Sequence, residues 1–171
     1  MNTYHATPYD ISAMGFYFQT MEEYEEKAAS HRNAHGDPVE EYEIQFIDGD
    51  DYALFSALDI NQANLWDWFE NIEGNFEGEE LVKALYLAIH TGKTIEDLDH
   101  KRLDDVMIFE GSMKDYAEQY LEDSGIFDAV EKAGLNPFYV DVDAYARDME
   151  INGGFTTYEH GRTCYVVEYM A

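Results

Sequence analysis

The chain has 171 residues, with 37 Asp and Glu against 10 Lys and Arg, so its formal net charge is −27. Its 46% hydrophobic and 15% aromatic content is enough to bury a core, which argues against disorder. The charge repels nucleic acids and anionic lipids, so we expect no direct binding of either. The N-terminus lacks the pattern of a signal peptide, no apolar run of about 18 residues occurs, and Cys164 is the single cysteine. These features predict a cytoplasmic protein.

The negative charge is spread along the whole chain. Residues 1–58 have a net charge of −10, residues 59–100 of −8 and residues 101–171 of −9. Residues 33–82 contain 14 Asp or Glu and no Lys or Arg. Ordinary soluble domains mix both signs, so this self-repulsion points to a functional use of the charge.

Residues 1–58 show alternating strand and helix patterns. Period-two aromatic residues predict a strand over 16–18, and Thr20 with Glu23 forms a capping-box pattern for a helix ending near Ser30. Alternation over 42–46 predicts a second strand with one wet face. We expect a small α+β domain here.

Residues 59–100 show helical spacing. One predicted amphipathic helix places on its apolar face Leu65, Trp66, Phe69 and Ile72. A second covers 79–90, stops at Gly92 and turns inward Leu81, Leu85, Ala88 and Ile89. Thr94 with Asp97 resembles a further helix start. This stretch is expected to be a helical middle domain.

Residues 101–171 return to mixed patterns. The sequence predicts a strand at 106–108, a helix capped by Ser112 and ending at Gly125, and a helix over 142–149. Two further strands, 155–158 and 163–169, form a predicted hairpin turning at His160 and Gly161. The fold class is therefore α+β, with three small domains at 1–58, 59–100 and 101–171.

No cluster of residues predicts catalysis, a metal or a cofactor. The pair His31 and His35 is better explained as a polar helix end, and the aspartates of 48–51 lack the Gly and Glu of a calcium loop. Cys164 is interpreted as a packed strand residue, without the surroundings of a nucleophile. We therefore expect no enzyme.

The acidic surface has three interpretations from composition: halophilic adaptation, a low-pI interaction domain, or imitation of a polyanion. Duplex DNA carries one charge per about 1.7 Å, so 27 charges equal those of about 46 Å of duplex. Carboxylates at i and i+4 on a helix stand about 6 Å apart, close to the phosphate spacing of one strand. The charge thus permits mimicry of DNA.

Four blocks, in the same order and with similar spacing, resemble the ArdA antirestriction proteins. They are GFYFQTMEEYEEK (15–27), EYEIQFID (41–48), KDYAEQYLEDSG (114–125) and AYARDMEINGGF (144–155). The family's Val-Pro-Glu motif is incomplete, because Val130-Glu131 lacks the proline, whereas the Tyr139-Val140-Asp141 segment is retained.

This resemblance implies a function. ArdA proteins come from mobile elements and mimic DNA to inhibit type I restriction–modification enzymes. They are elongated homodimers of three-domain protomers that dimerise through the C-terminal domain. The resemblance implies the same for this chain, with the methyltransferase core of the enzyme as partner and no catalytic site.

The predicted carriers of mimicry are thirteen acidic residues of the base-free stretch: Glu40, Glu41, Glu43, Asp48, Asp50, Asp51, Asp59, Asp67, Glu70, Glu73, Glu77, Glu79 and Glu80. The alternatives are a mimic aimed at another DNA-binding protein, or a small acidic cation-binding or enzymatic domain.

Overall fold

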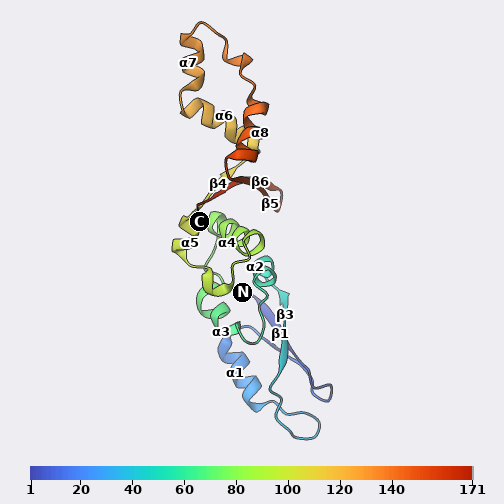
Figure 1. Ribbon diagram of the computed structural model, residues 1–171. Helices are drawn as coiled ribbons and strands as arrows, with labels where there is room; N and C mark the ends of the chain where they lie inside the picture. Colours follow the sequence, from blue (N-terminus) through green and yellow to red (C-terminus); the bar gives the residue numbers. More distant parts are fainter. Residues whose placement is uncertain (171) are drawn as a thin grey trace. The chain divides into compact units, whose positions relative to one another are not determined.

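The computed structural model describes residues 1–170 (Figure 1) and is α+β, as predicted. Its contacts divide the chain into two compact units, Met1–Asp99 and a second that begins at His100. In the part of the chain that is described, no helix has the length and hydropathy needed to cross a membrane.

The first unit contains a three-stranded antiparallel sheet in the order β2-β1-β3. The two predicted strands are confirmed as β2 (Phe16–Phe18) and β3 (Tyr42–Asp48). The central strand β1 (Thr3–Pro8) buries Tyr4 and Ala6. This strand was not predicted, because two alternating apolar residues are too few to give a clear strand pattern.

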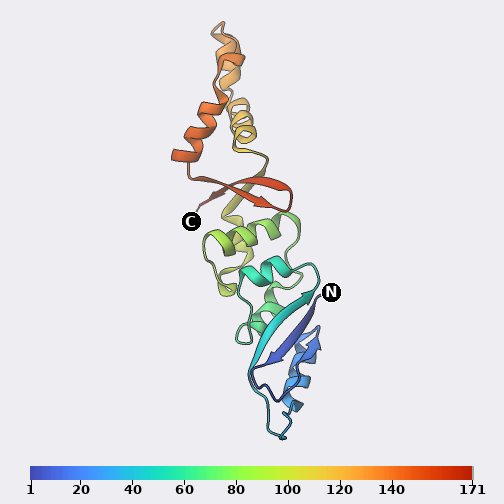
Figure 2. The same cartoon turned by 90° about the vertical axis from the view of Figure 1, so that its right-hand side faces the viewer.

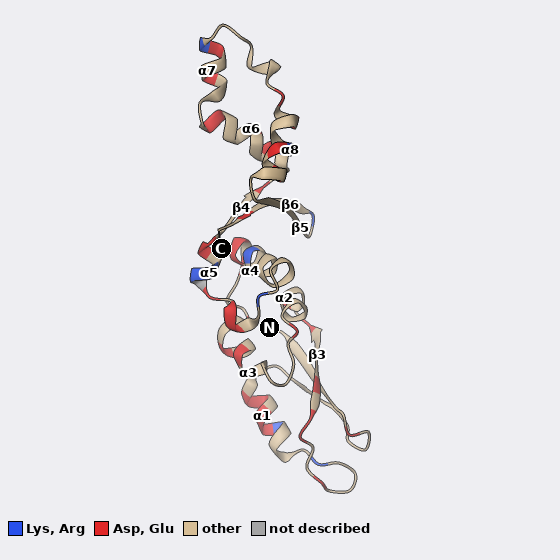
Figure 3. Cartoon of the chain, in the orientation of Figure 1, with Lys and Arg blue, Asp and Glu red and all other residues tan. Residues whose placement is uncertain are grey.

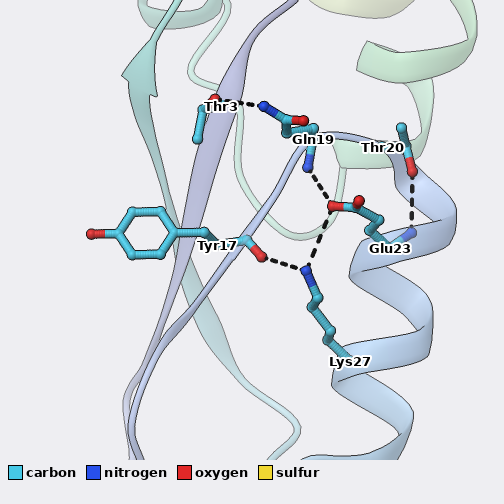
Figure 4. Close-up of polar contacts among 6 residues, drawn as sticks. All are labelled: Thr3, Tyr17, Gln19, Thr20, Glu23 and Lys27. Atoms are coloured by element: carbon cyan, nitrogen blue, oxygen red, sulfur yellow. Dashed lines mark hydrogen bonds and ion pairs between the residues drawn. The ribbon is translucent and has the colours of Figure 1, made fainter.

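Helix α1 (Met21–Ser30) begins and ends where the sequence predicts. The Thr20 side chain accepts a hydrogen bond from the backbone N–H of Glu23 at 3.2 Å. The Glu23 carboxylate accepts from the backbone N–H of Gln19 at 3.0 Å and pairs with Lys27 at 3.6 Å, while Lys27 also donates to the Tyr17 carbonyl at 2.8 Å (Figure 4). These contacts join the start of α1 to the end of β2.

The rest of the first unit is helical (Figure 2). Its segments are α2 (Tyr52–Ala57), α3 (Leu65–Asp67), the π-helical turn η1 (Trp68–Ile72), α4 (Gly78–His90) and the 3-10 turn η2 (Ile95–Asp97). Tyr4 of the sheet contacts the rings of Phe55 and Phe69, and Phe55 contacts Trp68. One aromatic core thus joins residues on both sides of position 58, where we expected a domain boundary.

Two residues expected to face the core are exposed, which corrects the helical pattern of the middle stretch. Trp66 is 55% exposed, whereas Trp68 is fully buried, because the inward face is formed by Leu65, Trp68 and Ile72, and Trp66 lies off that face. Ile89 is 54% exposed at the end of α4, where residues 84–88 are all buried. The predicted stop at Gly92 is confirmed by its φ of +65°.

The second unit packs helices on a sheet of order β4-β6-β5. Its segments are α5 (His100–Asp104), β4 (Val106–Glu110), α6 (Met113–Asp123), α7 (Ile126–Lys132), the 3-10 turn η3 (Pro137–Tyr139), α8 (Val142–Asn152), β5 (Phe155–His160) and β6 (Thr163–Tyr169). The core joins α6, α8 and β6 through Met113, Ala117, Ala146 and Val166.

The predicted elements of this unit are confirmed with one shift. His160 pairs with Thr163, so the hairpin turns at Gly161 and Arg162 and not at His160. Helix α7 was not predicted. It has no buried residue, and so its sequence carries no strong apolar periodicity.

Candidate functional site

All thirteen predicted acidic residues lie in the first unit, and ten of them are exposed. The half-buried residues are Asp51, Asp67 and Glu73. Figure 3 shows the acidic residues of this unit on β3, on α1 and around α3, with few basic residues among them. The unit has 22 acidic and four basic residues, for a net charge of −18.

Strand β3 positions the first group of acids by its alternation. Tyr42 and Ile44 point into the core, so Glu41 and Glu43 take the opposite, exposed face. The strand then runs into an exposed turn at Asp48 and Asp50.

The first turn of α4 positions a second group. Glu77 is the N-cap residue, and Glu79 and Glu80 occupy the first turn. Carboxylates are favoured there, because the unpaired N–H groups give that end of a helix a partial positive charge. Glu79 also pairs with Lys83 at 2.9 Å.

Two of the predicted acids have a structural role through Asn2, a buried polar residue that is 4% exposed. Its Nδ2 atom donates to Asp51 Oδ2 at 2.6 Å and to Glu73 Oε1 at 2.8 Å. Its Oδ1 accepts from the backbone N–H of Asp50 at 3.2 Å. Asn2 therefore holds together two carboxylates that would otherwise repel.

The same network continues into the core. Tyr4 donates to Glu73 Oε1 and accepts from Trp68 Nε1, both at 2.8 Å. Burial raises the pKa of the Tyr4 hydroxyl, which keeps it a donor. The carboxylates of Asp51 and Glu73 thus help to fix the fold of the acidic surface, and Asp50 joins the same network through its backbone N–H.

The residues considered in the sequence for metal binding or nucleophilic catalysis, His31 and Cys164, have contacts typical of structural residues. His31 Nδ1 lies 2.9 Å from the Tyr42 hydroxyl, which donates to the Val39 carbonyl. Cys164 is half-buried on β6 and not in a disulfide. Among the side chains that the structure describes, no three His, Cys, Asp or Glu residues are grouped to hold a metal ion.

The structure adds acids that the base-free stretch did not include. Glu22 and Glu25 of α1 line a groove of about 300 Å³ together with Trp66 and Glu70. The sequence analysis did not select Glu22 and Glu25, because it was limited to the stretch without basic residues, and Lys27 and Arg32 separate them from that stretch. The spacing of Glu22 and Glu25, three apart on one helix face, was the available signal.

The comparisons with known proteins give one match. The family model described as "Antirestriction protein (ArdA)" matches residues 4–163. The searches of the curated proteins and of the solved structures yielded no match. Since the family model spans most of the 171 residues and the fold is the predicted α+β, the chain belongs to the ArdA antirestriction protein family.

Proposed function

We propose that this antirestriction protein inhibits type I restriction–modification enzymes by occupying the DNA-binding groove of their methyltransferase core. The observation that carries this proposal is the set of exposed carboxylates on the first unit. These carboxylates replace DNA phosphates against the Lys and Arg side chains of the enzyme. The protein itself binds no nucleic acid and catalyses no reaction, and it acts in the bacterial cytoplasm, where these enzymes meet foreign DNA.

The energy of this interaction is spread over many contacts. Each exposed ion pair contributes roughly 0.2–1 kcal/mol and is screened by salt. Binding should therefore weaken with ionic strength and tolerate the loss of any one carboxylate. This behaviour distinguishes a distributed acidic surface from an inhibitor whose charge contacts depend on one carboxylate.

We also propose that the protein is a homodimer formed through the second unit. Neither α7 nor η3 has a buried residue. Phe138 and Tyr139 are 86% and 83% exposed. Together with Phe127 they line an open pocket with a volume of about 670 Å³. A second copy would remove this apolar surface from water. Sedimentation of the Phe138→Asp variant should show a monomer where the parent protein shows a dimer.

The inhibitory function is tested by competition. A labelled duplex is bound to a purified type I methyltransferase core, and this protein is added at two salt concentrations. We expect displacement at near-stoichiometric protein, weaker at the higher salt. No displacement in excess protein at low salt would contradict the proposal and favour a mimic aimed at another DNA-binding protein.

The same titration in EDTA tests the alternative of a cation-binding domain. Displacement that is unchanged by the chelator supports the mimic. Loss of displacement together with loss of the folded state would instead favour a bound cation.

A further inference from the structure

A groove between α1 and the α3–η1 segment combines aromatic and acidic side chains. Its apolar lining comes from Met21, Trp66 and Phe69, and its acidic lining is given by Glu22, Glu25, Glu70 and Glu73. The groove lies within the first unit, so one compact body forms all of it.

The exposure of Trp66 is built into the local fold. Its neighbours Leu65 and Trp68 are both fully buried, and they fix the segment against the core. With these two residues facing inward, the Trp66 side chain faces outward and keeps 55% of its surface exposed. The neighbouring Phe69 ring is held by Tyr4 and Phe18, at centroid distances of 5.4 and 6.3 Å. The Phe69 ring is therefore held in place beside the outward-facing Trp66.

One of the four carboxylates of the groove is fixed as well. Glu73 accepts hydrogen bonds from Asn2 and Tyr4, both at its Oε1 atom. Glu22, Glu25 and Glu70 are exposed. Lys27, the basic residue of α1, bonds to Glu23 and to the Tyr17 carbonyl and does not line the groove.

An aromatic face beside several carboxylates is complementary to a cation with an apolar stem. Arginine fits this chemistry better than lysine, because its planar guanidinium stacks on an aromatic ring and at the same time donates to carboxylates. A DNA phosphate backbone offers negative charge but no aromatic ring at this position. The stacking of an arginine on Trp66 would therefore be an interaction in addition to the mimicry of DNA charge.

We propose that this groove receives an arginine side chain of the basic protein that the chain inhibits. This inference rests on the proposed function, because that function supplies a partner with a basic surface. Trp66 is then an anchor within an otherwise distributed interface.

The competition titration tests the anchor with three variants. Trp66→Leu keeps an apolar side chain but removes the ring, and it should raise the half-displacing concentration about tenfold. Trp66→Phe should lie between this variant and the parent. Ile89→Ala, a matched change of an exposed apolar residue outside the groove, should leave displacement unchanged.

Salt separates the ring contact from the carboxylate contacts. The loss caused by Glu70→Gln should shrink at the higher salt concentration, because screening already weakens that contact in the parent. The loss caused by Trp66→Leu should persist. If Trp66→Leu displaces the duplex as well as the parent does, the anchor is overturned, while the proposed function stands.

A second measurement tests the groove without the enzyme. The two indole N–H signals are followed by NMR as a tetra-arginine peptide is added, with tetra-citrulline as the uncharged control of the same shape. The Trp66 signal, identified by its loss in Trp66→Leu, should move with arginine and not with citrulline, and the Trp68 signal should stay in place. If the parent protein displaces no duplex, the proposed function fails. The peptide titration then still tests whether the groove binds arginine. An unmoved Trp66 signal overturns the inference.

Discussion

At the scale of single residues, two tyrosines of one aromatic cluster differ in how their hydroxyls are satisfied. Tyr24 and Tyr42 are both buried, and their rings contact at 6.1 Å. The Tyr24 hydroxyl has no hydrogen-bond partner among the described residues, and burial raises its pKa to about 12. The Tyr42 hydroxyl bonds to Val39 and His31.

This difference predicts opposite effects of removing the two hydroxyls. Tyr24→Phe should leave the free energy of unfolding unchanged or raise it by up to about 1 kcal/mol, because it removes an unsatisfied buried group. Tyr42→Phe should lower it by about 1–2 kcal/mol, because it leaves two partners unpaired. Denaturant unfolding of both variants measures this, and equal losses would contradict the assignment.

Asp10 predicts a local pH dependence. Hydrogen bonds from Asn33 at 2.8 Å and from the Ser12 side chain at 2.7 Å lower the pKa of its carboxyl from 3.8 to about 2. A lowered pKa stabilises the fold above the ordinary pKa, and this contribution is lost as the pH falls from about 4 to about 2. Asp10→Asn should thus be less stable than the parent at pH 7, and the difference should vanish near pH 2.

The matched control for this experiment is Asp37→Asn, which removes a charge near the same loops. It should not reproduce the pH-dependent difference when unfolding is followed at each pH. A difference for Asp10→Asn that persists at low pH would show that the hydrogen bonds do not depend on the carboxylate charge.

At the scale of elements, the caps of the helices set the boundaries that the sequence predicted. Ser112 accepts from the Asp115 backbone N–H at 3.2 Å, and the Asp115 carboxylate accepts from the Ser112 N–H at 2.8 Å. The Ser112 hydroxyl also donates to the Asp115 carboxylate, and this bond, together with that from the Ser112 N–H, lowers the pKa of Asp115. A capping motif is local in sequence, so α6 was predictable.

The cap of α6 predicts a measurable contribution to stability. Ser112→Ala should lower the free energy of unfolding by about 1 kcal/mol, because it removes the acceptor for a backbone N–H of the first turn. Ser112→Asn, which keeps a capping acceptor, should retain most of the stability. Thermal and denaturant unfolding of both variants test this, and equal losses would show that the capping bond contributes little.

At the scale of the whole molecule, the acidic surface acts as a sum of weak contacts. A single amide substitution at Glu40, Glu41, Glu43, Asp48 or Asp50 should raise the half-displacing concentration by about twofold or less. All five substitutions together should raise it about tenfold or more and make its dependence on salt shallower. The competition titration measures both effects.

The matched control exchanges Glu and Asp at the same five positions, which keeps every charge. It should displace the duplex nearly as well as the parent. If any one of the five amide substitutions abolishes displacement, the interface is not distributed.

The sequence by itself determined the α+β class, most element boundaries and the exposure of most acidic residues. Helix caps and strand alternation are local in sequence, so Thr20, Ser112 and the pattern of β3 were enough to place these elements. Charged carboxylates favour water, so the exposure of most acids was also predictable. Only the tertiary structure decided which residues 49 and 71 positions apart would meet. It places Asn2 between Asp51 and Glu73. It also buries Trp68, which donates to Tyr4, and leaves Trp66 exposed. The groove between α1 and α3 arises from that packing and has no counterpart in any single segment.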